Sequence, residues 1–139
     1  MNWFTWALLS AFFAALTAIL AKVGVSSIDS NVATAIRTSV VVVFTWLIVA
    51  AAKRPGQWSS FNSRTLVFLV LSGLATGLSW ICYFHALKIG EASRVAPIDK
   101  LSVILVILAG TVFLGERLTW GKAVGGLLIA AGAICITLD

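Results

Sequence analysis

The chain has 139 residues, of which 60% are hydrophobic and only 11% are charged, and its mean hydropathy is +1.06. A water-soluble chain carries roughly 25% charged residues, so this composition excludes a soluble domain and predicts an integral membrane protein. The formal net charge of +5 does not indicate nucleic-acid binding, because the basic residues flank apolar runs and form no single surface.

Five apolar runs follow one another along the chain, and each is long enough to cross a bilayer as a helix. The first run is a retained helix and not a signal peptide, since no basic side chain precedes it and four more runs follow. Ser30 or Asn31 is the expected N-cap of the second helix, and the segment KRPGQ from Lys53 ends it. The turn GERLT begins at Gly115. The predicted spans are residues 3–21, 32–52, 65–87, 95–114 and 120–138.

The short loops leave no room for a soluble domain, so we predict a single all-α transmembrane domain over residues 1–139, lying in the lipid bilayer. An odd number of spans places the termini on opposite sides, called here side A for the N terminus and side B for the C terminus. Four tryptophans form an interfacial belt at side A: Trp3, Trp6, Trp58 and Trp120.

The basic residues give a weak orientation signal, with side A favoured in the cytoplasm and both orientations permitted. Side A holds Lys53, Arg54, Arg64, Arg117 and Lys122; side B holds Lys22, Lys88 and Arg94, with Arg37 and Lys100 buried beneath it.

Three ionisable residues fall inside the predicted spans, namely Arg37, Asp99 and Lys100. A charge in the bilayer costs from about 2.5 kcal/mol upward, so such residues face a protein interior or a watery cavity. Spans two and four both begin at side B, which places the three residues in one layer roughly 6–8 Å deep at ~1.5 Å per residue. Asp99 and Lys100 are sequence neighbours about 100° apart on a helix, so we predict that Arg37 pairs with Asp99. That pair either only joins the helices or also lines the translocation cavity, and Lys100 either faces the cavity or reaches the headgroups.

Span three brings aromatic residues close to this layer. Trp80, Tyr83, Phe84 and Leu87 share one helix face, which serves packing or stacks a flat substrate. His85 is either a helix-end residue near the headgroups or a group that exchanges protons with Asp99.

Pro97 belongs to the first turn of span four, where we expect a helix start in preference to a functional kink. Cys82 and Cys135 are expected as buried free thiols, although a disulfide is possible in principle.

Two segments resemble a known family. YFHALKIGEASRVAPIDKLS, residues 83–102, and FLGERLTWGKAVGGLLIAAGAI, residues 113–134, resemble the second half of an EamA domain, the module of the drug/metabolite transporter superfamily. The five-span length, the inward Arg37 and the LGERLT turn also fit that pattern. Larger members resemble two such modules in tandem. The resemblance therefore implies that this one-module chain works as a homodimer, antiparallel in one arrangement, or with a sister five-span subunit.

Small residues mark faces on which helices pack closely. Gly73 and Gly77 form one GxxxG motif, and the predicted dimer face of span five contains Gly121, Gly125, Gly126 and Gly132. The segment GLLIAAGA from Gly126 also resembles the dimerising helix of small multidrug resistance proteins. Those proteins use a glutamate in their first helix, whereas no carboxylate precedes Asp29 here. The basic layer instead suggests a zwitterionic or anionic metabolite.

These observations predict a secondary transporter that exports a small metabolite or amino-acid-like solute across the plasma (inner) membrane, with its cavity lined by spans 1–4. The alternative is a membrane scaffold, or an accessory subunit of a heteromeric transporter. An enzyme is not expected, because the sequence has one histidine and neither HExxH nor GxSxG. We expect no cofactor and no metal.

Overall fold

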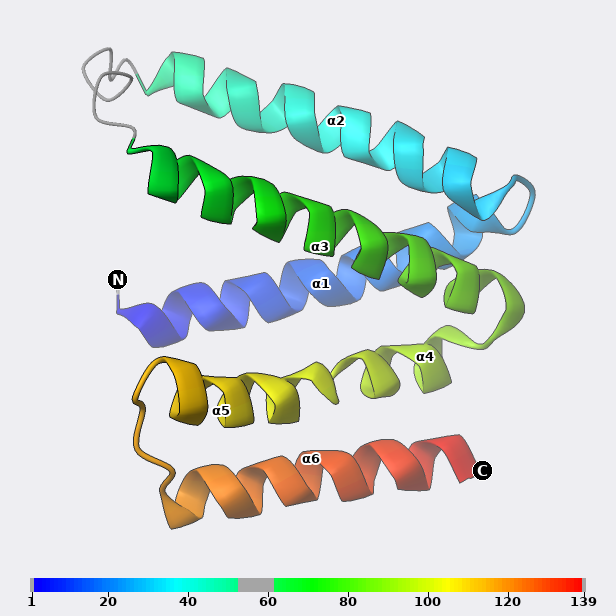
Figure 1. Cartoon of the computed structure of the whole chain (residues 1–139). Helices are drawn as coiled ribbons and strands as arrows, with labels where there is room; N and C mark the ends of the chain where they lie inside the picture. The colour runs from blue at the N-terminus through cyan, green and yellow to red at the C-terminus, as the bar shows by residue number, and fades with distance from the viewer. Residues whose placement is uncertain (1, 53–61, 139) are drawn as a thin grey trace. The chain divides into compact units, whose positions relative to one another are not determined.

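The computed structural model describes residues 2–52 and 62–138, and the regular structure in these ranges is helical. Figure 1 shows the helices in chain order: α1 (Trp3–Val25), α2 (Ser30–Ala51), α3 (Ser63–Ile89), α4 (Ala92–Asp99), α5 (Ser102–Phe113) and α6 (Trp120–Leu138). Among the described residues, five helices are long and apolar enough to cross a membrane: α1, α2, α3, α6 and the combined segment Ala92–Phe113. The predicted five-span, all-α membrane fold is confirmed. Lys53, Arg54, the KRPGQ turn and Trp58 lie outside the described residues.

Large apolar side chains are exposed along all of the long helices, as a protein surrounded by lipid requires. Trp3, Trp6 and Trp120, three members of the predicted belt, are among them. The exposed apolar surface and the helix lengths together define a multi-pass membrane protein.

The chain divides into two compact units, Ala21–Lys88 and the flanking segments Met1–Leu20 with Ile89–Asp139. We call the first the α2–α3 unit and the second the α4–α6 unit, and we describe each separately.

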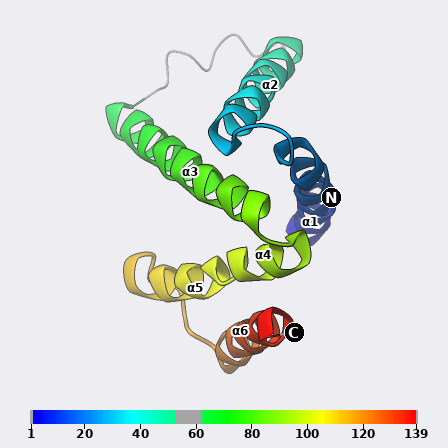
Figure 2. The same cartoon turned by 90° about the vertical axis from the view of Figure 1, so that its right-hand side faces the viewer.

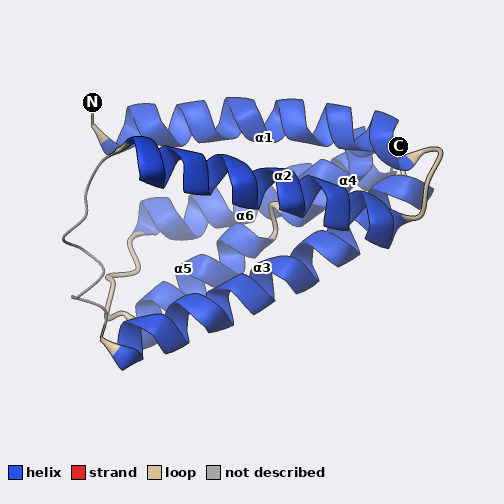
Figure 3. Ribbon diagram, turned by 90° about the horizontal axis from the view of Figure 1, so that it is seen from above, coloured by secondary structure: helices blue, strands red, loops and turns tan. Residues whose placement is uncertain are grey.

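In the α2–α3 unit, the two helices converge where α2 begins and α3 ends, and they separate toward their other ends (Figures 2 and 3). The converging end contains the fully buried side chains of Val25 and Leu87 together with Phe84, which is 2% exposed. Two lysines form hydrogen bonds between segments at this end. Lys22 Nζ donates to the Leu87 carbonyl at 2.6 Å, and Lys88 Nζ donates to the Ile28 carbonyl at 3.0 Å. The first bond reaches the last turns of α3, and the second reaches the loop between α1 and α2.

In the α4–α6 unit, α6 packs against both α4 and α5. Gly126 is buried at this contact, where a Cβ atom would lie 3.6 Å from Ile107 Cδ1, and Ala133 on the same face is 3% exposed. Small side chains let helix backbones approach closely in lipid, where no hydrophobic force drives helices together.

The N-cap of α2 is Asp29, so the prediction of Ser30 or Asn31 was wrong. Asp29 has extended backbone (φ −64°, ψ 138°), and its carboxylate accepts from the backbone N–H groups of Asn31 at 2.9 Å and Val32 at 3.3 Å. Ser30 is the first helical residue and is buried. These bonds stabilise the carboxylate and lower the pKa of Asp29, an effect that burial opposes and that the charges of Lys88 and His85 reinforce.

Candidate translocation site

Span four is interrupted where its charged residues lie. Helix α4 ends at Asp99 and α5 begins at Ser102. Between them the backbone N–H groups of Lys100, Leu101, Val103 and Ile104 each donate to the carbonyl three residues earlier, at 3.0–3.1 Å. Such i→i−3 bonds tighten the helix locally and are typical of hinges and strained segments.

Pro97 lies inside α4, so the expectation that it starts the helix was wrong. The helix begins at Ala92, five residues before the proline, because a polar first turn with Ser93 and Arg94 precedes the apolar run. Glu91, the N-cap residue, pairs instead with Arg94 at 3.3 Å. Within a helix a proline has no N–H for the carbonyl four residues earlier, here that of Ser93, and its ring clashes with that turn. The interruption follows three residues later.

Asp99 and Lys100 lie together at the interruption. Lys100 Nζ lies 3.1 Å from Asp99 Oδ2, so the two neighbours form an ion pair. Neighbours on a continuous helix point to different faces, but Lys100 lies outside α4, so the expectation for these two residues was wrong. Both side chains are partly exposed, at 58% for Lys100 and 37% for Asp99.

Arg37, in the α2–α3 unit, lies against aromatic rings. Its Cζ atom is 4.2 Å from the ring centroid of Trp80 and 5.3 Å from that of Phe84. A guanidinium over an aromatic face is attracted by the ring quadrupole, and this attraction strengthens away from water. The predicted aromatic face of α3 therefore holds the Arg37 side chain. Its predicted pair with Asp99 joins two separate units and stays a prediction.

The other two predicted residues of α3 lie near its end. Tyr83 is half-buried and makes an edge contact with Phe84, with ring centroids 6.4 Å apart. His85 is exposed four residues before the helix ends. Proton exchange between His85 and Asp99 also stays a prediction.

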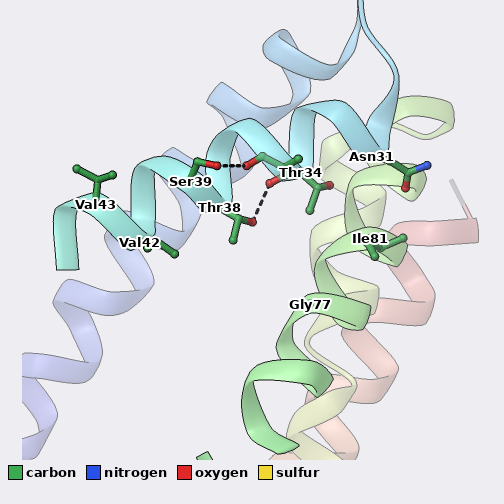
Figure 4. A pocket seen from close by; sticks show the side chains of 9 residues that line it. Asn31, Thr34, Thr38, Ser39, Val42, Val43, Gly77 and Ile81 are labelled. Carbon is green, nitrogen blue, oxygen red and sulfur yellow. Dashed lines mark hydrogen bonds between the residues drawn. The ribbon is translucent and has the colours of Figure 1, made fainter. Parts of the chain in front are cut away.

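A groove of about 520 Å³ lies between α2 and α3, and sequence reasoning missed it (Figure 4). It lies on another face of α2 from Arg37. Its lining residues carry no charge: Asn31, Thr34, Ala35, Thr38, Ser39, Val42 and Val43 from α2, with Gly77 and Ile81 from α3. The α2 residues recur at i, i+3, i+4, i+7 and i+8, a helix-face pattern that could have revealed the groove. Its volume falls within the range of small-molecule sites.

The glycines of α6 divide between two faces. Gly126 contacts α5 of its own chain, whereas Gly125 and Gly132 have no atom within 4 Å of where a Cβ atom would lie, and Gly121 has only Thr119 Oγ1 at 4.0 Å. At about 100° per residue, Gly121, Gly125 and Gly132 lie within ~40° of one another, and Gly126 lies roughly 100–140° away from them.

Cys82 and Cys135 are free and exposed, which corrects the expectation that they are buried. Both sit on helix surfaces rich in other exposed apolar side chains, and a thiol behaves there as a small apolar group.

Comparison with known proteins identifies the family. The model of the EamA-like transporter family matches residues 1–138. A Sinorhizobium protein named as an uncharacterized transporter in the cobO 3'region is 54% identical over 140 residues, covering 99% of this chain and 97% of that protein. No solved structure matches significantly. The chain belongs to the EamA-like transporter family, and it is therefore a transporter of the drug/metabolite transporter superfamily.

Two other relatives match over smaller parts. The uncharacterized transporter YvbV of Bacillus subtilis is 34% identical over 58% of this chain and 25% of its own length. A probable 4-amino-4-deoxy-L-arabinose-phosphoundecaprenol flippase subunit, ArnF of Erwinia tasmaniensis, is 41% identical over 49% of this chain and 55% of its own length. The chain thus corresponds to about a quarter of the first protein and about half of the second.

Proposed function

We propose that this transporter is a secondary exporter of a small metabolite or amino-acid-like solute across the plasma membrane. The observation that carries the proposal is the uncharged groove between α2 and α3, which lies in the same unit as the guanidinium of Arg37. A transporter needs a site within the membrane where polar groups contact the solute, and a groove with several hydroxyl groups is suited to that role.

Arg37 is the residue that we propose for the anionic group of the solute. Its guanidinium lies over the rings of Trp80 and Phe84, and a guanidinium bound to aromatic faces keeps N–H groups that can donate to a carboxylate. Tyr83 and His85 lie near the same end of α3, on side B, and we propose that they also line the translocation path. Asp99 and Lys100 are the second charged group that we propose for translocation, and Asp99 is the proposed proton carrier.

The direct test is an efflux and resistance screen in a host with and without the gene, followed by flux measurements on the responding solute. Arg37→Ala should abolish the flux, whereas Arg64→Ala should retain it, because Arg64 lies close to the first turn of α3 and only approaches Phe68, at 5.9 Å. If no solute responds in the screen, or if the Arg37→Ala protein transports normally, the proposal is wrong in its central residue or in its function.

Coupling to protons has its own test. Glu91 is a helix cap and Glu116 lies in the α5–α6 loop, so Asp99 is the carboxylate available within a described span. We expect Asp99→Asn to uncouple flux from a pH gradient. Wild-type flux that is unchanged when the gradient is collapsed would leave facilitated diffusion or another ion.

The second candidate is an accessory subunit of a heteromeric transporter. It is favoured by the Erwinia relative, whose name describes a flippase subunit. Purified protein reconstituted alone distinguishes the two candidates, because a homodimeric exporter is active in vesicles that contain this chain only, and an accessory subunit is not.

A further inference from the structure

The hydroxyl groups in the α2–α3 groove use their own protons inside α2. Thr34 Oγ1 donates to the Ser30 carbonyl at 2.8 Å, Thr38 Oγ1 to the Thr34 carbonyl at 2.7 Å, and Ser39 Oγ to the Ala35 carbonyl at 3.0 Å. Figure 4 shows the bonds of Thr38 and Ser39. A hydroxyl group has one proton and two lone pairs, so each of these oxygens is left as an acceptor.

Polar and apolar groups are ordered along the groove. From the start of α2, the lining runs through Asn31, Thr34, Ala35, Thr38 and Ser39 before it reaches Val42 and Val43. Ile81 from α3 lies beside Asn31 and Thr34 (Figure 4). Gly77 keeps the α3 wall open, because nothing lies within 4 Å of where its Cβ atom would be. One end of the groove therefore accepts hydrogen bonds and the other end is apolar.

We propose that the groove binds an amphipathic molecule whose head group donates hydrogen bonds, that is, an alcohol or an ammonium group, and whose apolar body lies against Val42 and Val43. This proposal rests on the proposed transport function and names the chemical class that the groove selects. A head group that only accepts would meet oxygen lone pairs, and a buried polar group without its partner is strongly disfavoured. Apart from the hydroxyl groups, whose protons are already donated within α2, the Asn31 amide is the one side-chain donor among the lining residues.

The recognition can be measured without transport, by protection of a cysteine placed in the groove. The host protein carries Cys82→Ser and Cys135→Ser, which remove both exposed thiols, together with Ser39→Cys. Labelling of purified protein with N-ethylmaleimide is followed in the presence of four probes that share a phenyl group: 2-phenylethanol, 2-phenylethylamine, the methyl ether of 2-phenylethanol, and phenylacetate.

We expect the alcohol and the amine to slow labelling at concentrations about tenfold lower than the ether, which corresponds to about one net hydrogen bond. Comparison of the alcohol with the amine tells whether the preferred head group is neutral or cationic. Phenylacetate should protect least. Thr45→Cys is the matched control site, because Thr45 Oγ1 makes the same bond, to Val41 at 2.9 Å, and is not among the groove residues. Its labelling should respond to none of the probes.

A second variant tests the acceptor directly. Thr38→Val removes one oxygen at nearly constant shape and should reduce the advantage of the alcohol over the ether to within about threefold. Thr45→Val, the control, should leave that advantage at about tenfold.

Three outcomes would overturn the proposal: equal protection by the ether and the alcohol, best protection by phenylacetate, or a Ser39→Cys thiol that resists labelling and crosslinks to a second copy, which means that a partner helix fills the groove. These outcomes are separate from the fate of the proposed function. A protein that exports a solute but shows no donor preference contradicts only the groove chemistry, and one that shows the preference without flux contradicts only transport.

Discussion

Arg37 illustrates how far a sequence defines a single membrane residue. The apolar run around it requires an interior partner for its charge, and an acidic residue was the natural choice. The contacts of Arg37 with the aromatic rings depend on how α2 packs against α3. The spacing of apolar residues along the sequence does not predict that packing. Trp80 and Phe84 could be placed on one face of α3 from their spacing, but not opposite Arg37.

A double-mutant cycle should measure this stack. We expect Arg37→Met and Trp80→Leu each to lower thermal stability in detergent, and their coupling free energy to be about 0.5–2 kcal/mol, the range for a cation over an aromatic ring. Arg64→Met with Phe68→Leu is the matched control, because that contact is longer, at 5.9 Å, and its coupling should be near zero. Additive effects of the Arg37 and Trp80 substitutions would mean that the rings do not stabilise the guanidinium.

Asp29 was missed as the cap of α2 for a local reason. The segment from Ser26 to Asn31 offers several residues that cap helices well, and the apolar pattern begins only at Val32, which favours the candidates nearest to it. The first helical turn need not be apolar, so α2 begins at Ser30.

Asp29→Ala should therefore lower the melting temperature at neutral pH, whereas Asp29→Asn should retain most of it, since an amide oxygen also caps helices. The pH dependence has a defined sign. Because the folded-state pKa is lowered from its ordinary value of 3.8, the carboxylate contributes stability above that value, and this contribution is lost as the pH falls through the lowered folded-state pKa. Thermal unfolding followed by circular dichroism should show a steeper acid loss for wild type than for Asp29→Asn. Parallel curves for the two proteins would contradict the cap.

Span four shows the same limit at the scale of an element. The apolar run predicted one helix, and length and composition still identify Ala92–Phe113 as one candidate span. The sequence placed Pro97 in a first turn, where a proline is harmless, whereas it lies five residues after the start of α4 and three residues before the interruption begins at Lys100. The first turn of α4 is polar, so the apolar pattern did not show that the helix begins at Ala92.

Pro97→Ala should repair the interruption. An alanine restores an N–H for the Ser93 carbonyl, and removing a proline from a helix interior is worth up to about 3 kcal/mol. We expect slower amide hydrogen exchange over residues 98–104 and reduced transport, because a continuous helix directs Asp99 and Lys100 to different faces. Pro97→Gly is the control, since it restores the N–H with about 1 kcal/mol less helix propensity. Unchanged exchange in the alanine variant would show that the proline does not cause the interruption.

At the scale of the whole molecule, the number of spans, the family and the membrane environment could all be predicted, because they depend on composition and on the order of apolar runs. Assembly is different, since it depends on which small residues the chain uses internally. The sequence grouped four glycines of α6 on one broad face, and Gly126 contacts α5 of its own chain.

Assembly through α6 gives the last prediction. Gly121, Gly125 and Gly132 leave a narrow open strip on which a second helix can approach closely, and we propose that a partner packs there to complete an inverted repeat. We expect Gly125→Leu with Gly132→Leu to dissociate the pair and abolish flux while leaving the fold of each chain intact. Gly126→Leu should instead destabilise the single chain, because its side chain would meet Ile104 and Ile107. Single cysteines at position 121, placed in the background without native thiols, report the pairing by crosslinking. Reporters on the C terminus, read from both sides of the membrane, distinguish antiparallel from parallel partners. Flux from vesicles that each hold a single chain would disprove obligatory pairing, and a C terminus found on one side only would exclude the antiparallel homodimer and leave a parallel or heteromeric pair.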